Sequence, residues 1–142
     1  MNVKVINKSV HGLGLPKYET SGASAMDIRS NERIIIQPYT VEKVGTGLFV
    51  EVPHLIDMSF RSRSGLSIKG LIVRNAPATI DSDFRNEVKV ILYNESDSPI
   101  IVDLGERVAQ CIFTPIVRIN WQEVKELSKT DRKGGFGSTG LK

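Results

Sequence analysis

The sequence has few of the residues from which disulfide frameworks, metal centres and membrane spans are built. A single cysteine, Cys111, excludes a disulfide within the chain, and no Cys/His cluster has metal-ligand spacing. Cys111 lies in the apolar run VAQCIF, where a thiol is expected to be buried as a small hydrophobe. His11 and His54 stand far apart beside glycine or proline and receive no catalytic role. No apolar stretch is long enough to span a membrane, and the N-terminus has no signal-peptide core. We therefore expect no membrane contact and a cytoplasmic protein, or a nuclear or host-cell one if the source is eukaryotic or viral.

The chain also lacks a run of basic residues. Its formal net charge of +3 arises from Lys, Arg, Asp and Glu interleaved along 142 residues, so there is no stripe of the kind that binds nucleic acid. We expect no nucleic-acid partner, whereas a small polyanionic ligand fits this balance. The length suits one domain with one core.

Helical signals are weak, and short apolar runs alternate with turn residues. Ile and Val outnumber Leu, which favours strands. The run EVKVILYN places Val88, Val90 and Leu92 on one face. PYTVEKVGTGLFVEVP is interpreted as two strands joined through residues 45–47. RSGLSIKG could form one short turn or helix, and NWQEVKEL fits either a helix or an irregular strand. The predicted fold is all-β, an antiparallel sandwich or jelly-roll-like barrel. Strands are expected at residues 3–6, 25–28, 32–37, 40–44, 47–52, 57–62, 70–74, 87–93, 99–102 and 107–115.

The chain ends on a segment, DRKGGFGSTGLK, that can neither fill a core nor hold a helix. It is not the P-loop of NTPases, because no helix can follow its Ser-Thr pair. A glycine-rich end of this kind is often only a flexible tail. However, one aromatic among glycines can close over a flat ring while hydroxyls and backbone amides meet phosphate. The alternative is therefore a lid over a nucleotide.

Four other segments contain polar residues that a core does not require. SGASAMDIRS carries Asp27 inside an apolar strand, and LGERVAQ is a charged turn leading to Gln110. RSRSGLSIKG brings the Arg63 guanidinium, a hydroxyl and backbone N–H groups to one turn, which is either an anion site or a solvated turn. NAPATIDSDFRNEV holds Asp81 two residues from Asp83. If this is a strand, the two carboxylates share a face; if it is a turn, Asp83 caps local amides.

These five segments, in this order, resemble the five motifs of the trimeric dUTPase family over nearly the whole chain. The resemblance implies a homotrimer of jelly-roll-like subunits, residues 1–130 forming the β-barrel and 131–142 a flexible arm. It also implies Mg²⁺-dependent hydrolysis of dUTP to dUMP and pyrophosphate, by water attack at the α-phosphorus, at three sites shared between subunits.

The resemblance assigns a role to each matching residue. Asp27 matches the aspartate that holds the metal through water, and Asp81 the aspartate that orients and activates the attacking water. Asn75 to Asp81, including Ala78, matches the hairpin that receives uracil, and Phe84 lies beside the sugar. The residues matched to phosphate binding or to the arm over the nucleotide are Arg63, Ser64, Gly65, Gln110, Arg132, Phe136, Gly137, Ser138 and Thr139.

Several positions depart from the family pattern. Phe84 stands where tyrosine is usual, Ser62 where proline is usual, and Ala78 where glycine is usual in the uracil hairpin. The arm is one residue shorter than is common between Arg132 and Phe136. Two other functions stay open at this stage: a relative on the same scaffold acting on cytosine nucleotides, such as a dCTP deaminase, and a non-catalytic β-domain that binds nucleotides or proteins.

Overall fold

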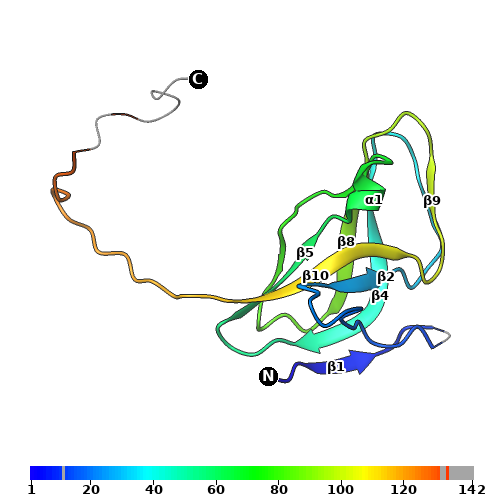
Figure 1. Ribbon diagram of the computed structural model, residues 1–142, viewed down its shortest axis with the longest axis horizontal. Coiled ribbons are helices and arrows are strands. Elements are labelled where there is room, and N and C mark those ends of the chain that lie inside the picture. Colours follow the sequence, from blue (N-terminus) through cyan, green and yellow to red (C-terminus); the bar gives the residue numbers. More distant parts are fainter. Residues whose placement is uncertain (11, 132–133, 135–142) are drawn as a thin grey trace.

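The computed structural model describes residues 1–10, 12–131 and 134, and its body is built almost entirely of antiparallel strands (Figure 1). One sheet has the strand order β1-β4-β8-β6, the second has the order β2-β10-β5-β7, and β3 and β9 form a two-stranded ribbon. This arrangement confirms the all-β prediction. The elements are β1 Lys4–Asn7, β2 Met26–Arg29, β3 Ile34–Ile36, β4 Val41–Glu51, β5 Ile56–Arg61, α1 Ser64–Ser67, β6 Leu71–Val73, β7 Ala78–Ile80, β8 Glu87–Asn94, β9 Ile100–Val102 and β10 Arg107–Pro115.

The core lies between the two four-stranded sheets and is filled by the inward residues of alternating strands. On β8, Val88, Val90 and Leu92 are buried while Lys89 is exposed, which confirms the predicted face. Phe60 of β5 and Ile28 of β2 close the core from the second sheet, each fully buried. The candidate site residues Asp27 of β2 and Gln110 of β10 thus lie on strands that are packed against the core.

The prediction of two strands around residues 45–47 is wrong, because Val41–Glu51 is one strand with an irregularity in it. The register against β8 shifts between Gly45 and Phe49. The N–H groups of Gly45 and Gly47 instead donate to carboxylates, at 2.7 Å to Glu32 Oε1 and 2.9 Å to Glu87 Oε1. Two acidic side chains therefore replace the ladder partners that the irregularity removes.

The segment after β10 runs away from both sheets (Figure 1). Residues 116–131 form no strand or helix, so neither alternative for NWQEVKEL is found in the chain by itself. Of the two alternatives for RSGLSIKG, a turn or a short helix, the structure has the helix, α1. Among the described residues, no helix is both long and apolar enough to cross a membrane. Arg132, Phe136, Gly137, Ser138 and Thr139 lie outside the described residues, and the proposed boundary at residue 130 stays a prediction.

Candidate active site

Three of the polar segments meet at one end of the second sheet. Strand β10 lies between β2 and β5, and Gln110 is the cross-strand partner of both Asp27 and Arg61. Cross-strand partners project to the same face of a sheet. The sheet register therefore brings the Asp27 segment and the Gln110 segment together and places Arg63 two residues further along the chain.

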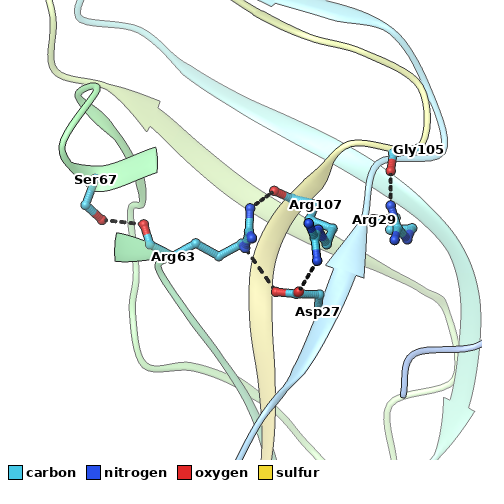
Figure 2. Close-up of polar contacts among 6 residues, drawn as sticks. All are labelled: Asp27, Arg29, Arg63, Ser67, Gly105 and Arg107. Carbon is cyan, nitrogen blue, oxygen red and sulfur yellow. Dashed lines mark hydrogen bonds and ion pairs between the residues drawn. The ribbon is translucent and has the colours of Figure 1, made fainter. Parts of the chain in front are cut away.

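The Asp27 carboxylate is held by two arginines (Figure 2). Its Oδ1 accepts from Arg63 Nε at 3.0 Å, and its Oδ2 accepts from Arg107 Nη1 at 3.2 Å. Arg63 Nη1 also donates to the backbone carbonyl of Arg107 at 2.9 Å. The Asp27 side chain is 14% exposed, and those of Arg63 and Arg107 are 27% and 43% exposed. Two cations around one carboxylate leave a net charge of +1, which favours an anion at this edge.

The turn that carries Arg63 is ordered by its own backbone and by one hydroxyl. Arg63 is extended, at φ −87° and ψ 133°, and its carbonyl accepts from Ser67 Oγ at 3.0 Å. Ser64 and Gly65 are exposed. A Cβ built at Gly65 would meet no atom within 4 Å, so packing within the chain does not require glycine there. The absence of a side chain at Gly65 leaves its backbone N–H open to close approach by a ligand.

Asp81 lies elsewhere, in the turn after β7. The backbone N–H of Phe84 donates to the carbonyl of Asp81 at 3.1 Å, so the segment is a turn and not a continuing strand. Asp81 lines a cavity of about 430 Å³ together with Asp57, Asp83 and Arg118. Of these, Asp57 has a buried carboxylate oxygen, Oδ1, with no hydrogen-bond partner in the described structure.

The register of β7 against β5 places Asp81 far from the Asp27 and Arg63 pair. Ile80 is the partner of Met58, which puts Asp81 beside Asp57. Six residues of extended chain separate Asp57 from Arg63, about 20 Å at the usual rise per residue. Within one chain, the two groups of predicted site residues therefore lie at opposite ends of β5.

The predicted uracil hairpin, residues 75–81, follows β6 of the first sheet and includes β7 of the second. Asn75 is exposed, and Ala78 is buried opposite Phe60 in the ladder. Phe84 is half-buried and packs against the core. The ring at position 84 is therefore held by the body of the domain, and only part of it faces solvent.

Cys111 confirms its predicted role as a buried residue. It is 1% exposed, and burial, followed by the charge of Asp57, raises the pKa of its thiol to about 12. A thiol in this state is not a nucleophile near neutral pH.

The donor chemistry at Asp27 fits a magnesium ion only if most ligands come from elsewhere. The described residues contain no group of three or more His, Cys, Asp or Glu side chains that could hold a metal. Each Asp27 oxygen already accepts one guanidinium and has a second lone pair to offer. Mg²⁺ usually keeps several waters and takes phosphate oxygens from the substrate. Asp27 can therefore hold such an ion through a bound water, without a protein cage.

Comparison with known proteins identifies the fold and the family. The family model described as dUTPase matches residues 13–140. The chain belongs to the dUTPase family. Among its curated relatives, a deoxyuridine 5'-triphosphate nucleotidohydrolase of Hydrogenobaculum is 44% identical over 97% of this chain and 98% of its own. A protein of the same name from Cytophaga hutchinsonii is 43% identical over 98% and 92% of the two chains.

Solved dUTPases share this fold at lower identity. A variant of the dUTPase from Staphylococcus phage 80alpha superposes with a TM-score of 0.87 at 22% identity, covering 96% of this chain and 98% of its own. A mutant of the dUTPase from S. aureus phage phi11, described as coordinating a structural Mg(II) ion, has a TM-score of 0.82 at 18% identity over 91% and 100% of the two chains. These likenesses confirm the jelly-roll-like β-fold expected for the dUTPase family.

Sequence reasoning missed Arg107. It lies inside the quoted segment LGERVAQ, three residues before Gln110, but three residues along a regular strand place two side chains on opposite faces. The signal that could have found it is the pair of consecutive apolar residues, Val108 and Ala109, which breaks the alternation of the strand.

Proposed function

We propose that this protein is a dUTP diphosphatase, which hydrolyses dUTP to dUMP and pyrophosphate. The proposal rests on the cluster of Asp27, Arg63 and Arg107, in a chain of the dUTPase family. The three side chains together carry a net charge of +1, which favours binding of a phosphate chain. Relatives over 40% identical along nearly the whole chain are named deoxyuridine 5'-triphosphate nucleotidohydrolases, which supports the same substrate here. The cellular purpose we propose is to limit uracil incorporation into DNA and to supply dUMP for thymidylate synthesis, in the cytoplasm.

In the proposed mechanism, Arg63 binds the phosphate chain through the part of its guanidinium that Asp27 does not occupy. Ser64 and Gly65 are exposed beside it, so a hydroxyl and backbone N–H groups can donate to phosphate oxygens, and Gln110 adds an amide from β10. Donors held in place before the substrate arrives stabilise the charge that builds up on the leaving pyrophosphate.

Asp81 is the proposed residue that orients and activates the attacking water. It is exposed and lines a cavity, where a water could bridge its carboxylate to the α-phosphorus. When bound, Mg²⁺ would neutralise the triphosphate and fix the geometry of its oxygens. Asp27 is the residue of this chain that would hold that ion through water.

Base and sugar selection are assigned to the hairpin. Uracil differs from cytosine by a donor and acceptor exchange on one edge, so fixed backbone groups between Asn75 and Asp81 can reject cytosine by leaving a buried group unpaired. Phe84, packed against the core, would block a ribose 2′-hydroxyl by its ring alone. In the arm, Phe136 would cover the base while Arg132, Gly137, Ser138 and Thr139 would meet phosphate.

We further propose that the working unit is a homotrimer with shared sites. A single chain holds Asp81 about 20 Å along the sheet from Arg63, so a complete site needs Asp81 from a second copy. The segment 116–131 leaves the body with large apolar side chains exposed, including Val117 at 88% and Trp121 at 93%. Apolar groups in such numbers favour burial against another subunit.

Pyrophosphate release from dUTP, dCTP, dTTP and UTP, each with Mg²⁺, tests the function. We expect dUTP to be strongly preferred. The Asp81→Asn variant should bind nucleotide and lose nearly all turnover, because the amide retains the shape but cannot accept the proton of water. Release from all four nucleotides at similar rates would remove the specificity while keeping the hydrolase; normal turnover by Asp81→Asn would overturn the mechanism.

A further inference from the structure

Arg107 contacts both Asp27 and Arg63, and the motifs of the dUTPase family quoted above assign no role to it. Its guanidinium donates to Asp27 Oδ2 at 3.2 Å, and its carbonyl accepts from Arg63 Nη1 at 2.9 Å (Figure 2). We propose that Arg107 is a positioning residue, which fixes the Arg63 guanidinium for phosphate binding through these two contacts. The inference rests on the proposed function, because it concerns the same phosphate site.

The strand that carries Arg107 is bent so that its side chain reaches this face. Gln110 pairs with Asp27, and Ala109 with Ile28, but the next pair joins Arg107 to Arg29, so the register shifts by one residue. A β-bulge places two residues opposite one and re-aims the side chains beyond it. Without the shift, Arg107 would point to the opposite face from Gln110; with it, the two side chains share a face with Asp27.

The burial of the neighbouring residues follows from the same bulge. Val108 and Ala109 are consecutive and are exposed by only 1% and 0%, whereas a regular strand at a sheet surface would bury one of the two. Both pack into the core and fix the backbone on the C-terminal side of Arg107. The carbonyl that holds Arg63 is therefore anchored by core packing and is not free to follow a side chain.

These contacts leave one part of Arg63 for the substrate. Its Nε is bound to Asp27 and its Nη1 to the Arg107 carbonyl, and Nη2 has no protein partner within the described part of the chain. With two of its nitrogens fixed, the planar guanidinium has one orientation, and the remaining N–H groups project from the cluster. Loss of the Arg107 side chain frees the second Asp27 oxygen to rotate and loosens this orientation.

The test is a double-mutant cycle on dUTP hydrolysis by the full-length protein. Arg107→Met removes one hydrogen bond between charged groups, so kcat/KM should fall about tenfold to a hundredfold. If Arg107 acts through Arg63, the double variant with Arg63→Met should be within about twofold of Arg63→Met alone. If the decrease in kcat/KM of the double variant equalled the product of the two single decreases, the proposal would be overturned.

Two further variants separate positioning from charge and from folding. Arg107→Lys keeps the net charge and can donate to Asp27, so we expect activity within about threefold of the wild type. Arg33→Met breaks a comparable but exposed pair, Arg33 with Asp103 at 3.0 Å, and should change neither activity nor melting temperature appreciably. An Arg107→Met loss no larger than that of Arg33→Met would also overturn the proposal.

Binding of inorganic triphosphate, measured by calorimetry on the same variants, keeps the inference separate from the function. If the wild type released no pyrophosphate from dUTP, the proposed function would fail. The coupling between Arg107 and Arg63 would still be measured as a non-additive loss of triphosphate affinity. Additive losses in that assay would overturn the positioning role whatever the substrate. If Arg107→Met does not fold, as its melting curve would show, the cycle is completed with Arg107→Gln, which also removes the charged contact with Asp27.

Discussion

Two inactive variants of this protein should restore each other when mixed. In one chain, Asp81 lies about 20 Å along the sheet from the Arg63 cluster, so no water held by Asp81 can reach a phosphate held by the same chain's Arg63. Asp81→Asn leaves the Arg63 cluster intact, and Arg63→Met leaves the Asp81 turn intact. A site that takes its cluster from one subunit and its aspartate from the next can therefore combine the two intact halves.

The expected recovery follows from counting the subunits of a cyclic assembly. In an equal mixture, the chain that supplies the cluster is intact at that position in half of the sites. The neighbour that supplies Asp81 is intact there in half of those. About a quarter of the sites should be complete, so activity should rise to about 25% of the wild-type value from near zero for either variant alone.

The assay is pyrophosphate release after the two variants have been unfolded together in denaturant and refolded as a mixture. The matched control mixes Asp27→Asn with Arg63→Met. These residues are joined by a 3.0 Å ion pair within one chain, so no subunit of that mixture carries both and activity should stay near that of the single variants. The wild type taken through the same procedure gives the reference value.

Either of two results would refute the reasoning. Recovery in the Asp27 and Arg63 mixture as large as in the Asp81 and Arg63 mixture would mean that the cluster is not a unit within one chain. No recovery in the Asp81 and Arg63 mixture, from variants shown to assemble together, would mean that one chain supplies both and that its β7 turn moves to the other end of β5.

The remaining predictions concern stability. As pH rises through 9.0, the ordinary pKa of a thiol, Cys111 ionises in the unfolded chain but not in the folded one, where its pKa is raised to about 12. Between these two pH values, the free energy of unfolding should fall by about 1.4 kcal/mol per pH unit. The Cys111→Ala variant, followed by urea unfolding at each pH, should lack this part of the slope. Gly47→Ala, at φ +70° and with backbone atoms 2.6 Å from its new Cβ, should lose at least about 3 kcal/mol in thermal unfolding, whereas Gly22→Ala, with nothing within 4 Å, should not. Ser62→Ala leaves the Val73 N–H, now bound at 2.8 Å, without its acceptor and should lose about 1–2 kcal/mol in urea unfolding, with Ser62→Thr close to the wild type.

The strands that could be predicted from sequence are those whose alternation survives intact. The eight residues of β8 alternate from one end to the other, and the sheet buries the predicted face. In β4 the same reasoning failed, because Gly45 and Gly47 are typical of a turn between strands. Whether these glycines form a turn or a bulge within one strand depends on Glu32 and Glu87, which lie far from them in sequence. The two carboxylates accept hydrogen bonds from the N–H groups of Gly45 and Gly47, so one strand continues through the bulge.

The site shows the same division between local and distant causes. Asp27, Arg63 and Gln110 were predicted because each stands out within its own segment, as a polar residue that local packing does not need. Arg107 does not stand out, since the position of its side chain beside Asp27 depends on a register shift against β2 that only pairing with another strand reveals. The separation of Asp81 from Arg63 is likewise a property of the β5–β7 register, and the motif order along the chain carries no trace of it.

The segment 116–131 shows why local preference alone cannot decide structure. Trp121, Val124 and Leu127 have spacings that a helix or a strand can accommodate, and the chain by itself forms neither. Ordering sixteen residues costs about 1–2 kcal/mol each in backbone entropy, and exposed apolar side chains return none of it. Only burial of these apolar side chains can offset that entropy cost. The body of this chain does not bury them, since Trp121 and Leu127 are 93% and 87% exposed. In the proposed trimer, contacts with another subunit would set the conformation of this segment. A substitution such as Trp121→Ser should therefore weaken association of the subunits while the β-barrel of each stays folded.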